Sequence, residues 1–173
     1  MTELDRLLEG NQRYVSAGTP RPKDAPPRRR LALVTCMDTR IDPLAVLGLG
    51  LGEAHVLRNA GGRVTADVLR SLVVSVHVLG VRTIVVMQHT QCGLARTTDE
   101  DLRRRTGADI DFYPIGDHIE ALQDDVGQVV SSGPLHLVHE TAGLLLDIET
   151  GAVQLVAKWP GGLKAGGAEG RGG

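Results

Sequence analysis

The sequence predicts an α/β fold built on a parallel β-sheet. Short apolar runs alternate with helical patterns along residues 31–89, in the order strand, short helix, strand, helix, strand, which is the pattern of a parallel α/β sheet. The runs at 31–35 and 83–87 are apolar throughout, as expected for strands buried on both faces. Aromatic residues make up only 2% of the 173 residues, so we expect a core of Leu, Val, Ile and Ala. A chain of this length predicts one domain.

The N-terminus carries an amphipathic helix. Leu4, Leu7, Leu8 and Val15 lie close to helical spacing, and Gly18 is a plausible stop. Such a helix must place its apolar face on another surface. Residues 19–30 are rich in proline and charge and predict an extended connector.

The first half of the domain has well-marked helix starts. Asp42 before Pro43, and Thr65 with Asp67 in the following turn, are typical of helix N-termini. The helix at 66–79 is apolar on most faces, so we expect it in a core or an interface. The expected elements are a strand at 31–35, a short helix from 43, a strand at 54–57, a turn at 58–62, a helix at 66–79 and the strand from 83.

The second half is less regular. Residues 94–115 are polar and irregular, with a short helix expected at 100–105. A longer helix is expected at 117–131, where Gly127 weakens it by about 1 kcal/mol relative to Ala. Strands are predicted at 135–138, 144–148 and 153–156.

Composition argues against several classes of function. The formal charge is −2, from 19 basic and 21 acidic residues, so we expect neither nucleic acid nor a membrane surface as a partner. No apolar run approaches the roughly 20 residues of a spanning helix, and no signal-peptide core follows Met1. We therefore expect a cytoplasmic protein with reduced thiols.

Three side chains are candidates for a metal site. Cys36 follows the first strand, and His89 and Cys92 follow the strand at 83–87. Parallel strands deliver their carboxyl ends to the same edge of a sheet, and thiolate and imidazole are ligands that Zn²⁺ prefers. Three protein ligands leave one position open, as in catalytic sites, where zinc lowers the pKa of water to about 7. Taken singly, each cysteine would instead be interpreted as an inert core residue.

Asp38 and Arg40 flank the first ligand on the same turn. The carboxylate can pair with the guanidinium and accept a hydrogen bond from water at the metal, or it can turn to the metal as a fourth ligand. An ordinary surface ion pair is the alternative. The other histidines have no ligand spacing, and we expect them to be structural or solvent-facing.

Three motifs together resemble the β-class carbonic anhydrases. They are Cys36-x-Asp38-x-Arg40, Arg58-Asn59-Ala60-Gly61-Gly62 and His89-Thr90-x-Cys92-Gly93. The resemblance extends over about residues 3–156, including Leu7-Leu8-Glu9-Gly10-Asn11 and Leu144 to Gly151. Each motif alone is weak, and their order at strand ends makes the combination specific.

The resemblance implies a fold, a site and a reaction. It implies Zn²⁺ on Cys36, His89 and Cys92, with Asp38 as a possible fourth ligand in a resting form. Asp38 and Arg40 would form the catalytic pair. Apart from the resemblance, we expect Arg58, Asn59, Gly61 and Gly62 to lie around the metal ligands, with a plain turn as the alternative for Arg58 and Asn59. The sheet would have four parallel strands and an antiparallel edge strand. The N-terminal arm would pack on a second subunit in a homodimer or a dimer of dimers.

The predicted organisation is therefore an arm at 1–18, a zinc-binding catalytic domain at 19–160 and a disordered glycine-rich tail at 161–173. The predicted reaction is the reversible hydration of carbon dioxide to bicarbonate. Hydrolysis of carbon disulfide or carbonyl sulfide and a non-catalytic zinc protein closed by Asp38 remain alternatives. A thiol redox protein has little support, because no Cys-x-x-Cys occurs.

Overall fold

The computed structural model describes residues 1–18 and 21–160, and the predicted tail lies outside them. The α-helices are α1 (Glu3–Ser16), α2 (Pro43–Val46), α3 (Ala66–His77), α4 (Asp99–Thr106) and α5 (His118–Ser131), and the short 3₁₀ helices are η1 (Ala60–Gly62), η2 (Gly93–Arg96) and η3 (Gly133–Leu135). The strands are β1 (Leu31–Cys36), β2 (Ala54–Asn59), β3 (Thr83–His89), β4 (Glu140–Leu146) and β5 (Val153–Trp159). Among the described residues, no helix combines the length and apolar character that a membrane span requires.

The strands form a single mixed sheet in the order β2-β1-β3-β4-β5. β1 pairs in parallel with both β2 and β3, β3 pairs in parallel with β4, and β5 pairs antiparallel with β4. The predicted α/β class, with its antiparallel edge strand, is confirmed. Because Leu31 is in register with both Ala54 and Thr83, the carboxyl ends of β1, β2 and β3 meet at one edge of the sheet.

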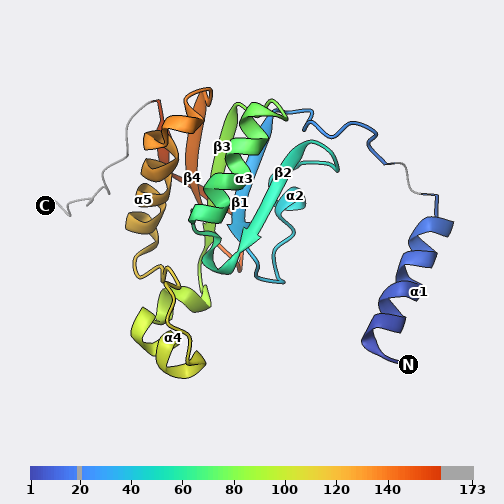
Figure 1. Cartoon of the computed structure of the whole chain (residues 1–173), viewed down its shortest axis with the longest axis horizontal. Coiled ribbons are helices and arrows are strands. Elements are labelled where there is room, and N and C mark those ends of the chain that lie inside the picture. The colour runs from blue at the N-terminus through green and yellow to red at the C-terminus, as the bar shows by residue number, and fades with distance from the viewer. Residues whose placement is uncertain (19–20, 161–173) are drawn as a thin grey trace, which may run out of the picture.

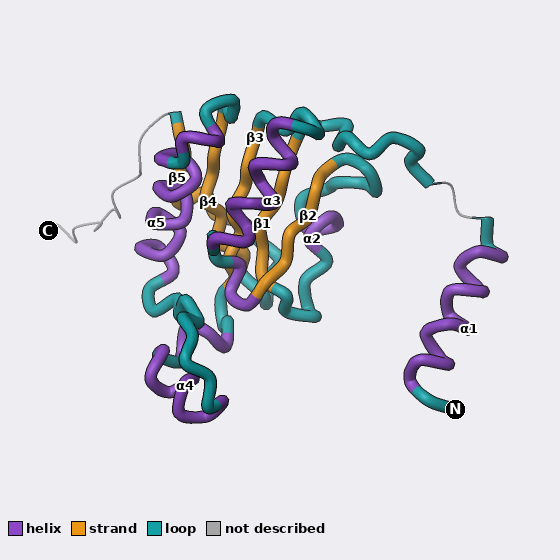
Figure 2. The backbone as a smooth tube through the Cα atoms, viewed as in Figure 1, coloured by secondary structure: helices purple, strands orange, loops and turns teal. Residues whose placement is uncertain are grey.

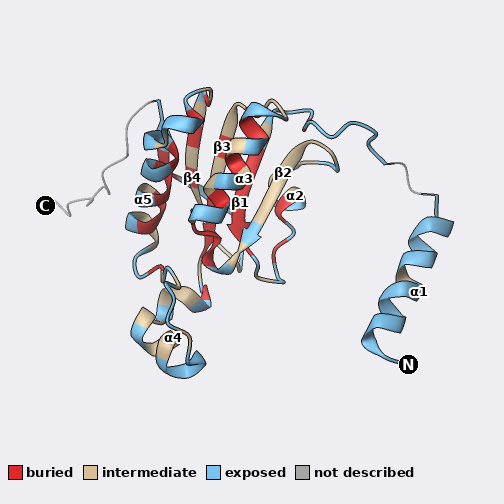
Figure 3. Ribbon diagram, viewed as in Figure 1, coloured by how far each residue is buried: buried red, intermediate tan, exposed pale blue. Residues whose placement is uncertain are grey.

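The two faces of the sheet bury different side chains. α3 and α5 lie over one face (Figure 1), where Val34 and Val86 of the central strands pack with Leu72 of α3 and Leu122 of α5. The opposite face packs residues from β1 and β3 against the segments that follow these strands. Figure 3 shows the buried residues concentrated in the central strands and on the inner sides of the two helices. Aliphatic burial on both faces makes the sheet a rigid support for its carboxyl edge.

The N-terminal helix α1 is well capped but buries none of its residues. Thr2 and Asp5 form a capping box, in which the Thr2 side chain accepts from the Asp5 amide and Asp5 accepts from the Thr2 amide. Leu4, Leu7 and Leu8 remain 64%, 63% and 57% exposed. Figure 2 shows α1 as a separate arm at the end of an extended connector. The predicted helix is confirmed, and its apolar face is left exposed in the single chain.

The predicted strands after α5 are partly wrong. Residues 135–138, predicted as a strand, lie in η3 and an irregular segment, because Pro134 favours the first turn of a short helix. The strand predicted at 144–148 is β4, which begins at Glu140 and ends at Leu146. Asp147 ends it, since its side chain accepts hydrogen bonds from the amides of Glu149 and Thr150.

Two other boundaries change the description of the site. β2 extends to Asn59, so Arg58 and Asn59 belong to a strand and not to the predicted turn. Cys36 and His89 are the last residues of their strands. The predicted helix starts are confirmed, because Asp42 and Thr65 accept hydrogen bonds from the amides of the first turns of α2 and α3.

Candidate metal centre

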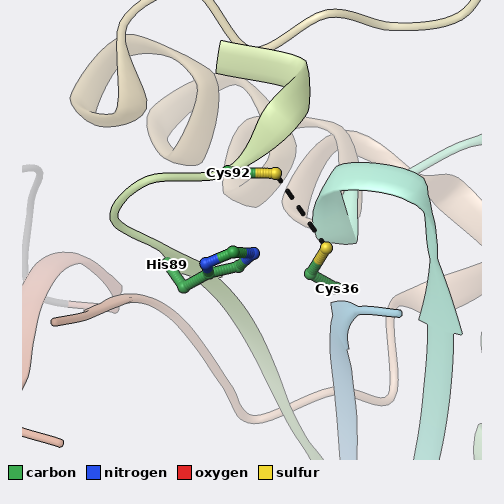
Figure 4. A group of neighbouring side chains, drawn as sticks. All are labelled: Cys36, His89 and Cys92. Carbon is green, nitrogen blue, oxygen red and sulfur yellow. Dashed lines mark hydrogen bonds between the residues drawn. The ribbon is translucent and has the colours of Figure 1, made fainter. Parts of the chain in front are cut away.

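Cys36, His89 and Cys92 converge at the carboxyl edge of the sheet. Their ligand atoms all lie within 4.8 Å of one another, and the two sulfur atoms are 4.0 Å apart (Figure 4). The three residues are 4%, 1% and 3% exposed. Adjacent parallel strands supply Cys36 and His89, and a turn through Gln91, with φ of 57°, brings Cys92 back beside them.

The ring of His89 is oriented with one nitrogen directed into the cluster. Its Nδ1 lies 2.8 Å from the carbonyl oxygen of Thr90, which fixes the proton on Nδ1 because a carbonyl only accepts. Nε2 therefore carries a lone pair, and this atom is buried without a hydrogen-bond partner among the described residues. A buried polar atom without a partner is unfavourable, and a metal ion would satisfy it.

The three ligand atoms fit a zinc ion. A Zn–S distance of about 2.3 Å places two sulfur ligands of a tetrahedral site about 3.8 Å apart, close to the 4.0 Å observed. A set of two thiolates and one imidazole is also chemically suited to zinc. Among the described residues, no other His, Cys, Asp or Glu group of this kind occurs.

The electrostatics of the cluster favour a bound cation. The two sulfur atoms share a hydrogen bond, which lowers the pKa of Cys36 to about 4 and, together with burial, raises the pKa of Cys92 well above its usual range. Only one of the two adjacent sulfur atoms therefore ionises readily. Burial lowers the pKa of His89, but the Cys36 sulfur and the Thr90 carbonyl outweigh it and raise that pKa overall. A divalent cation would remove the repulsion between the thiolates.

Asp38 lies beside this cluster and is paired with Arg40. Arg40 Nε donates to Asp38 Oδ1 at 2.9 Å and Nη2 donates to Oδ2 at 2.6 Å, while the Arg40 amide also donates to Oδ1. These bonds hold the pKa of Asp38 far below its usual range. Asp38 Oδ2 is 3.7 Å from His89 Nε2. The carboxylate thus borders the cluster while both of its oxygens are held by Arg40.

Arg58 fixes the backbone that carries Cys36 and Asp38. Its guanidinium donates to the carbonyl oxygens of Cys36 at 2.9 Å, of Asp38 at 2.6 Å and of Ile41 at 3.2 Å. Asn59 closes the next loop, since its side chain donates to the Arg63 carbonyl and accepts from the Arg63 amide. Neither residue contacts the ligand sulfur atoms through these bonds. Their contacts position the loops on which the site is built.

Gly61 and Gly62 allow the backbone to approach the site closely. Gly62 has φ of 66°, and a Cβ there would lie 2.8 Å from the Cys36 amide nitrogen and 2.9 Å from the Thr35 carbonyl carbon. Gly61 has φ of 77°, and its Cβ would lie 3.0 Å from Leu94 Cδ1. A side chain at either position would strain the backbone. At Gly62 it would also displace the backbone of Thr35 and Cys36.

A cavity of about 360 Å³ opens from the cluster. Besides Cys36, Asp38 and Cys92, its lining includes Met37, Ala60, Gly61, Gly93, Leu94, Thr97, Leu102 and Arg105. Part of this wall, from Leu94 to Arg105, belongs to the region that the sequence left undefined. Only the apolar spacing of Leu94 and Leu102 within a polar segment hinted at a buried role. The wall is mainly apolar, with Asp38 and Arg105 as its charged members.

A buried polar network behind the site was also missed by the sequence analysis. Gln88 is fully buried, and its side chain contacts His118 Nδ1 at 3.0 Å and Asp125 Oδ2 at 3.3 Å. Asp125 also accepts from Arg63 Nε at 2.8 Å and from the Val64 amide at 3.1 Å. Burial raises the pKa of Asp125 despite these bonds. The network joins β3 to α5 next to His89.

Fold and site together define an α/β protein with a Cys₂His candidate metal centre at the carboxyl edge of a parallel sheet. Residues 31–133 match the family model described as carbonic anhydrase. The chain is 38% identical to "Beta-carbonic anhydrase 1" of Mycobacterium tuberculosis, over 90% of this chain and 99% of that relative. It therefore belongs to the β-class carbonic anhydrase family, as the sequence motifs predicted.

Solved structures and a second group of relatives extend the comparison. A carbonic anhydrase crystal structure from Streptococcus mutans is similar with a TM-score of 0.81 and 39% identity, covering 90% of this chain and 98% of that chain. A carbon disulfide hydrolase of Acidianus sp. is 42% identical over 103 residues, which are 60% of this chain and 47% of that relative. The similarity to the mycobacterial relative thus covers far more of both chains.

Proposed function

We propose that this protein is a zinc-dependent carbonic anhydrase, which hydrates carbon dioxide reversibly to bicarbonate and a proton. One observation carries the proposal: three buried ligand atoms lie within 4.8 Å of one another, with a bare His89 Nε2 among them. A structural zinc site is usually closed by four protein ligands, whereas a catalytic site has three and an open position. Full-length similarity to a β-carbonic anhydrase supports the same reaction.

Cys36, His89 and Cys92 would hold the metal ion. Zinc in such a site supplies a Lewis acid that lowers the pKa of water to about 7, so that hydroxide is available near neutral pH. Arg40 keeps Asp38 ionised through two hydrogen bonds. The Asp38 carboxylate can therefore accept a hydrogen bond from the attacking solvent molecule and orient it. The apolar wall formed by Leu94 and Leu102 suits an uncharged substrate such as carbon dioxide.

The proposal is tested by zinc content and stopped-flow hydration of carbon dioxide. The purified wild-type protein should bind about one zinc ion per chain and accelerate hydration. Asp38→Asn should keep zinc and lose most of the turnover. Asp67→Asn is a matched control, because Asp67 also accepts from an arginine, Arg70 Nε at 2.9 Å, but is exposed on α3. A zinc-loaded wild-type protein without hydration activity would contradict the proposal.

Carbon disulfide is the second candidate substrate. The similarity to the Acidianus carbon disulfide hydrolase and the apolar cavity favour it. Release of hydrogen sulfide from carbon disulfide, measured beside carbon dioxide hydration on the same preparation, distinguishes the two. A non-catalytic protein closed by Asp38 has less support, since both carboxylate oxygens are held by Arg40.

We also propose that two copies of the chain associate through α1. The helix carries an apolar stripe with Leu4, Leu7 and Leu8 on one side, and this stripe is exposed in the single chain. An exposed apolar stripe of this kind marks an interaction surface. A homodimer or a dimer of dimers would bury it, and the cytoplasm remains the location that we predict.

A further inference from the structure

The cavity beside the metal centre contains one arginine whose charge is not paired. Arg105 lies in the last turn of α4 and lines the cavity together with Cys36, Asp38 and Cys92. Its side chain makes no hydrogen bond or ion pair with the described residues (1–18 and 21–160), and the residue is exposed. A guanidinium at this place presents several donors in a planar fork to whatever enters the cavity.

The neighbouring arginines are neutralised, which sets Arg105 apart. Arg103 Nη2 donates to Asp111 Oδ1 at 2.7 Å and Arg104 pairs with Asp101 one turn earlier on α4. Arg40 is likewise paired, with Asp38. Basic residues in the last turn of a helix also offset the helix dipole, but that role applies equally to the three arginines of α4. It does not explain why only Arg105 lines the cavity.

The charge balance of the site leaves Arg105 as the uncompensated positive charge in the cavity. Two thiolates at Cys36 and Cys92 offset the charge of a divalent cation, and Asp38 offsets Arg40. Arg105 is then the cavity residue that gives the site a net positive charge. Carbon dioxide is uncharged, but bicarbonate is a planar oxyanion, and a guanidinium can bind such an anion with two parallel hydrogen bonds. The rest of the wall, including Leu94 and Leu102, is mainly apolar and would not stabilise an anion.

We propose that Arg105 is a specificity-determining residue that attracts and binds bicarbonate at the mouth of the cavity. The inference rests on the proposed function, because bicarbonate is a substrate or product only of that reaction. Arg105 acts on the anion, so it lowers the KM for bicarbonate and speeds its entry. Because attraction between separated charges weakens with salt, the entry rate should fall as ionic strength rises.

The test compares Arg105→Gln, which removes the charge, with Arg105→Lys, which keeps it. Arg104→Gln is the matched control, since it makes the same charge change one residue away in the same turn of α4. The measurements are kcat and KM for bicarbonate dehydration over a range of ionic strength, and titration calorimetry of bicarbonate into the zinc-loaded proteins. Melting temperatures of the variants establish that the fold is kept.

Arg105→Gln should raise the dissociation constant and KM for bicarbonate roughly five- to tenfold, as expected for one accessible charged contact. The salt dependence of kcat/KM should flatten in Arg105→Gln and persist in Arg105→Lys and Arg104→Gln. Since the equilibrium constant is fixed, kcat/KM for hydration must change by the same factor as that for dehydration.

Two results would overturn different proposals. Equal bicarbonate affinity and salt dependence in Arg105→Gln and Arg104→Gln would overturn the role of Arg105, whatever the activity of the wild type. A wild-type protein that binds bicarbonate through Arg105 but does not hydrate carbon dioxide would support the anion site and overturn the proposed activity. Loss of bicarbonate binding in Arg105→Gln with normal affinity in Arg104→Gln supports the inference.

Discussion

Arg40 holds Asp38 by two side-chain hydrogen bonds, of 2.9 Å to Oδ1 and 2.6 Å to Oδ2. The same carboxylate lies only 3.7 Å from His89 Nε2. With a metal ion bound, the guanidinium and the metal would compete for the Asp38 carboxylate. We therefore expect Arg40 to keep the side of the cluster next to Asp38 accessible to solvent and substrate.

Substitution of Arg40 should therefore reduce activity without removing the metal. Arg40→Leu frees the Asp38 carboxylate to turn toward the cluster, and we expect kcat/KM for carbon dioxide hydration to fall at least about tenfold, equivalent to the loss of about 1.4 kcal/mol. Arg40→Lys keeps the charge but loses the planar guanidinium, so its kcat/KM should lie between those of the wild type and Arg40→Leu. Stopped-flow assays and zinc analysis of the same samples provide the measurement.

The matched control for Arg40→Leu is Arg70→Leu, at an arginine–aspartate pair on the protein surface. Arg70 donates to Asp67 at 2.9 Å on α3, and its replacement by Leu should leave activity and zinc content unchanged. If Arg40→Leu retained full activity, the pairing with Asp38 would have no role in turnover. If it lost zinc, Arg40 would be required for the structure of the site itself.

Removal of one thiol should remove the metal but not the fold. Cys92→Ala leaves two candidate ligands, and zinc content should fall from about one to near zero per chain. The large aliphatic cluster around Leu72, Ile84 and Leu122 lies on the other face of the sheet, so far-ultraviolet circular dichroism should stay close to that of wild type. The wild-type melting temperature should fall on addition of a chelator, while that of Cys92→Ala should not respond. Persistent stoichiometric zinc in Cys92→Ala would exclude this site.

The sequence predicted the part of the site that short motifs encode. Cys36, His89 and Cys92 end or follow apolar runs, and parallel strands must end at a common edge, so their place at one edge followed from local pattern. Their convergence also required β1 and β3 to be neighbours, which the strand order provides. The wall of the cavity did not, because Leu102 and Arg105 belong to the polar helix α4, and the position of this helix beside the site depends on tertiary structure. The same limit applies to Gln88, whose partners His118 and Asp125 are 30 and 37 residues away.

The fold shows the same division between local and non-local information. Helix starts at Asp42 and Thr65 were predicted because a cap is a contact within one turn. β4 was placed too late, because its first residue is Glu140, a type depleted in strands. Pairing of Glu140 with Thr83 across the sheet overrides that local preference. The segment 135–138 is not a strand, because Leu135 and Val138 are buried from a short 3₁₀ helix and the irregular residues after it.

Gly62→Ala should be strongly destabilising. The added Cβ would lie 2.8 Å from the Cys36 amide nitrogen at a residue with φ of 66°, and rigid backbone on both sides cannot move away. We expect a loss of about 2–4 kcal/mol in the free energy of unfolding, from strain and overpacking, measured by urea denaturation. Gly127→Ala is the matched control in α5, where the Cβ meets no atom within 4 Å. It should stabilise the protein by about 0.5–1 kcal/mol, and equal effects of the two substitutions would contradict the argument.

Asp125→Ala should also destabilise the protein, through a different mechanism. Asp125 is fully buried, and Arg63, Val64 and Gln88 all donate to its carboxylate. Removal leaves the Arg63 guanidinium, whose side chain is only 10% exposed, without its counter-charge. We expect a loss of about 3–5 kcal/mol in denaturant titrations. Asp124→Ala, one residue earlier on the exposed side of α5, should change stability by less than about 0.5 kcal/mol.

Leu7→Glu should weaken self-association through α1. Leu7 is 63% exposed in the single chain, and a charge in the middle of the apolar stripe would have to be buried without a partner in an interface. We expect the subunit dissociation constant, measured by analytical ultracentrifugation, to rise at least about tenfold, or about 1.4 kcal/mol. Arg13→Gln makes the same unit charge change on the opposite side of the helix, as the helical repeat places it, and should leave association unchanged.

Because the helix is capped by Thr2 and Asp5, neither substitution should unfold it. A chain that remains equally associated in Leu7→Glu and wild type would show that the apolar stripe of α1 is not the interface, and deletion of residues 1–18 would then be without effect as well.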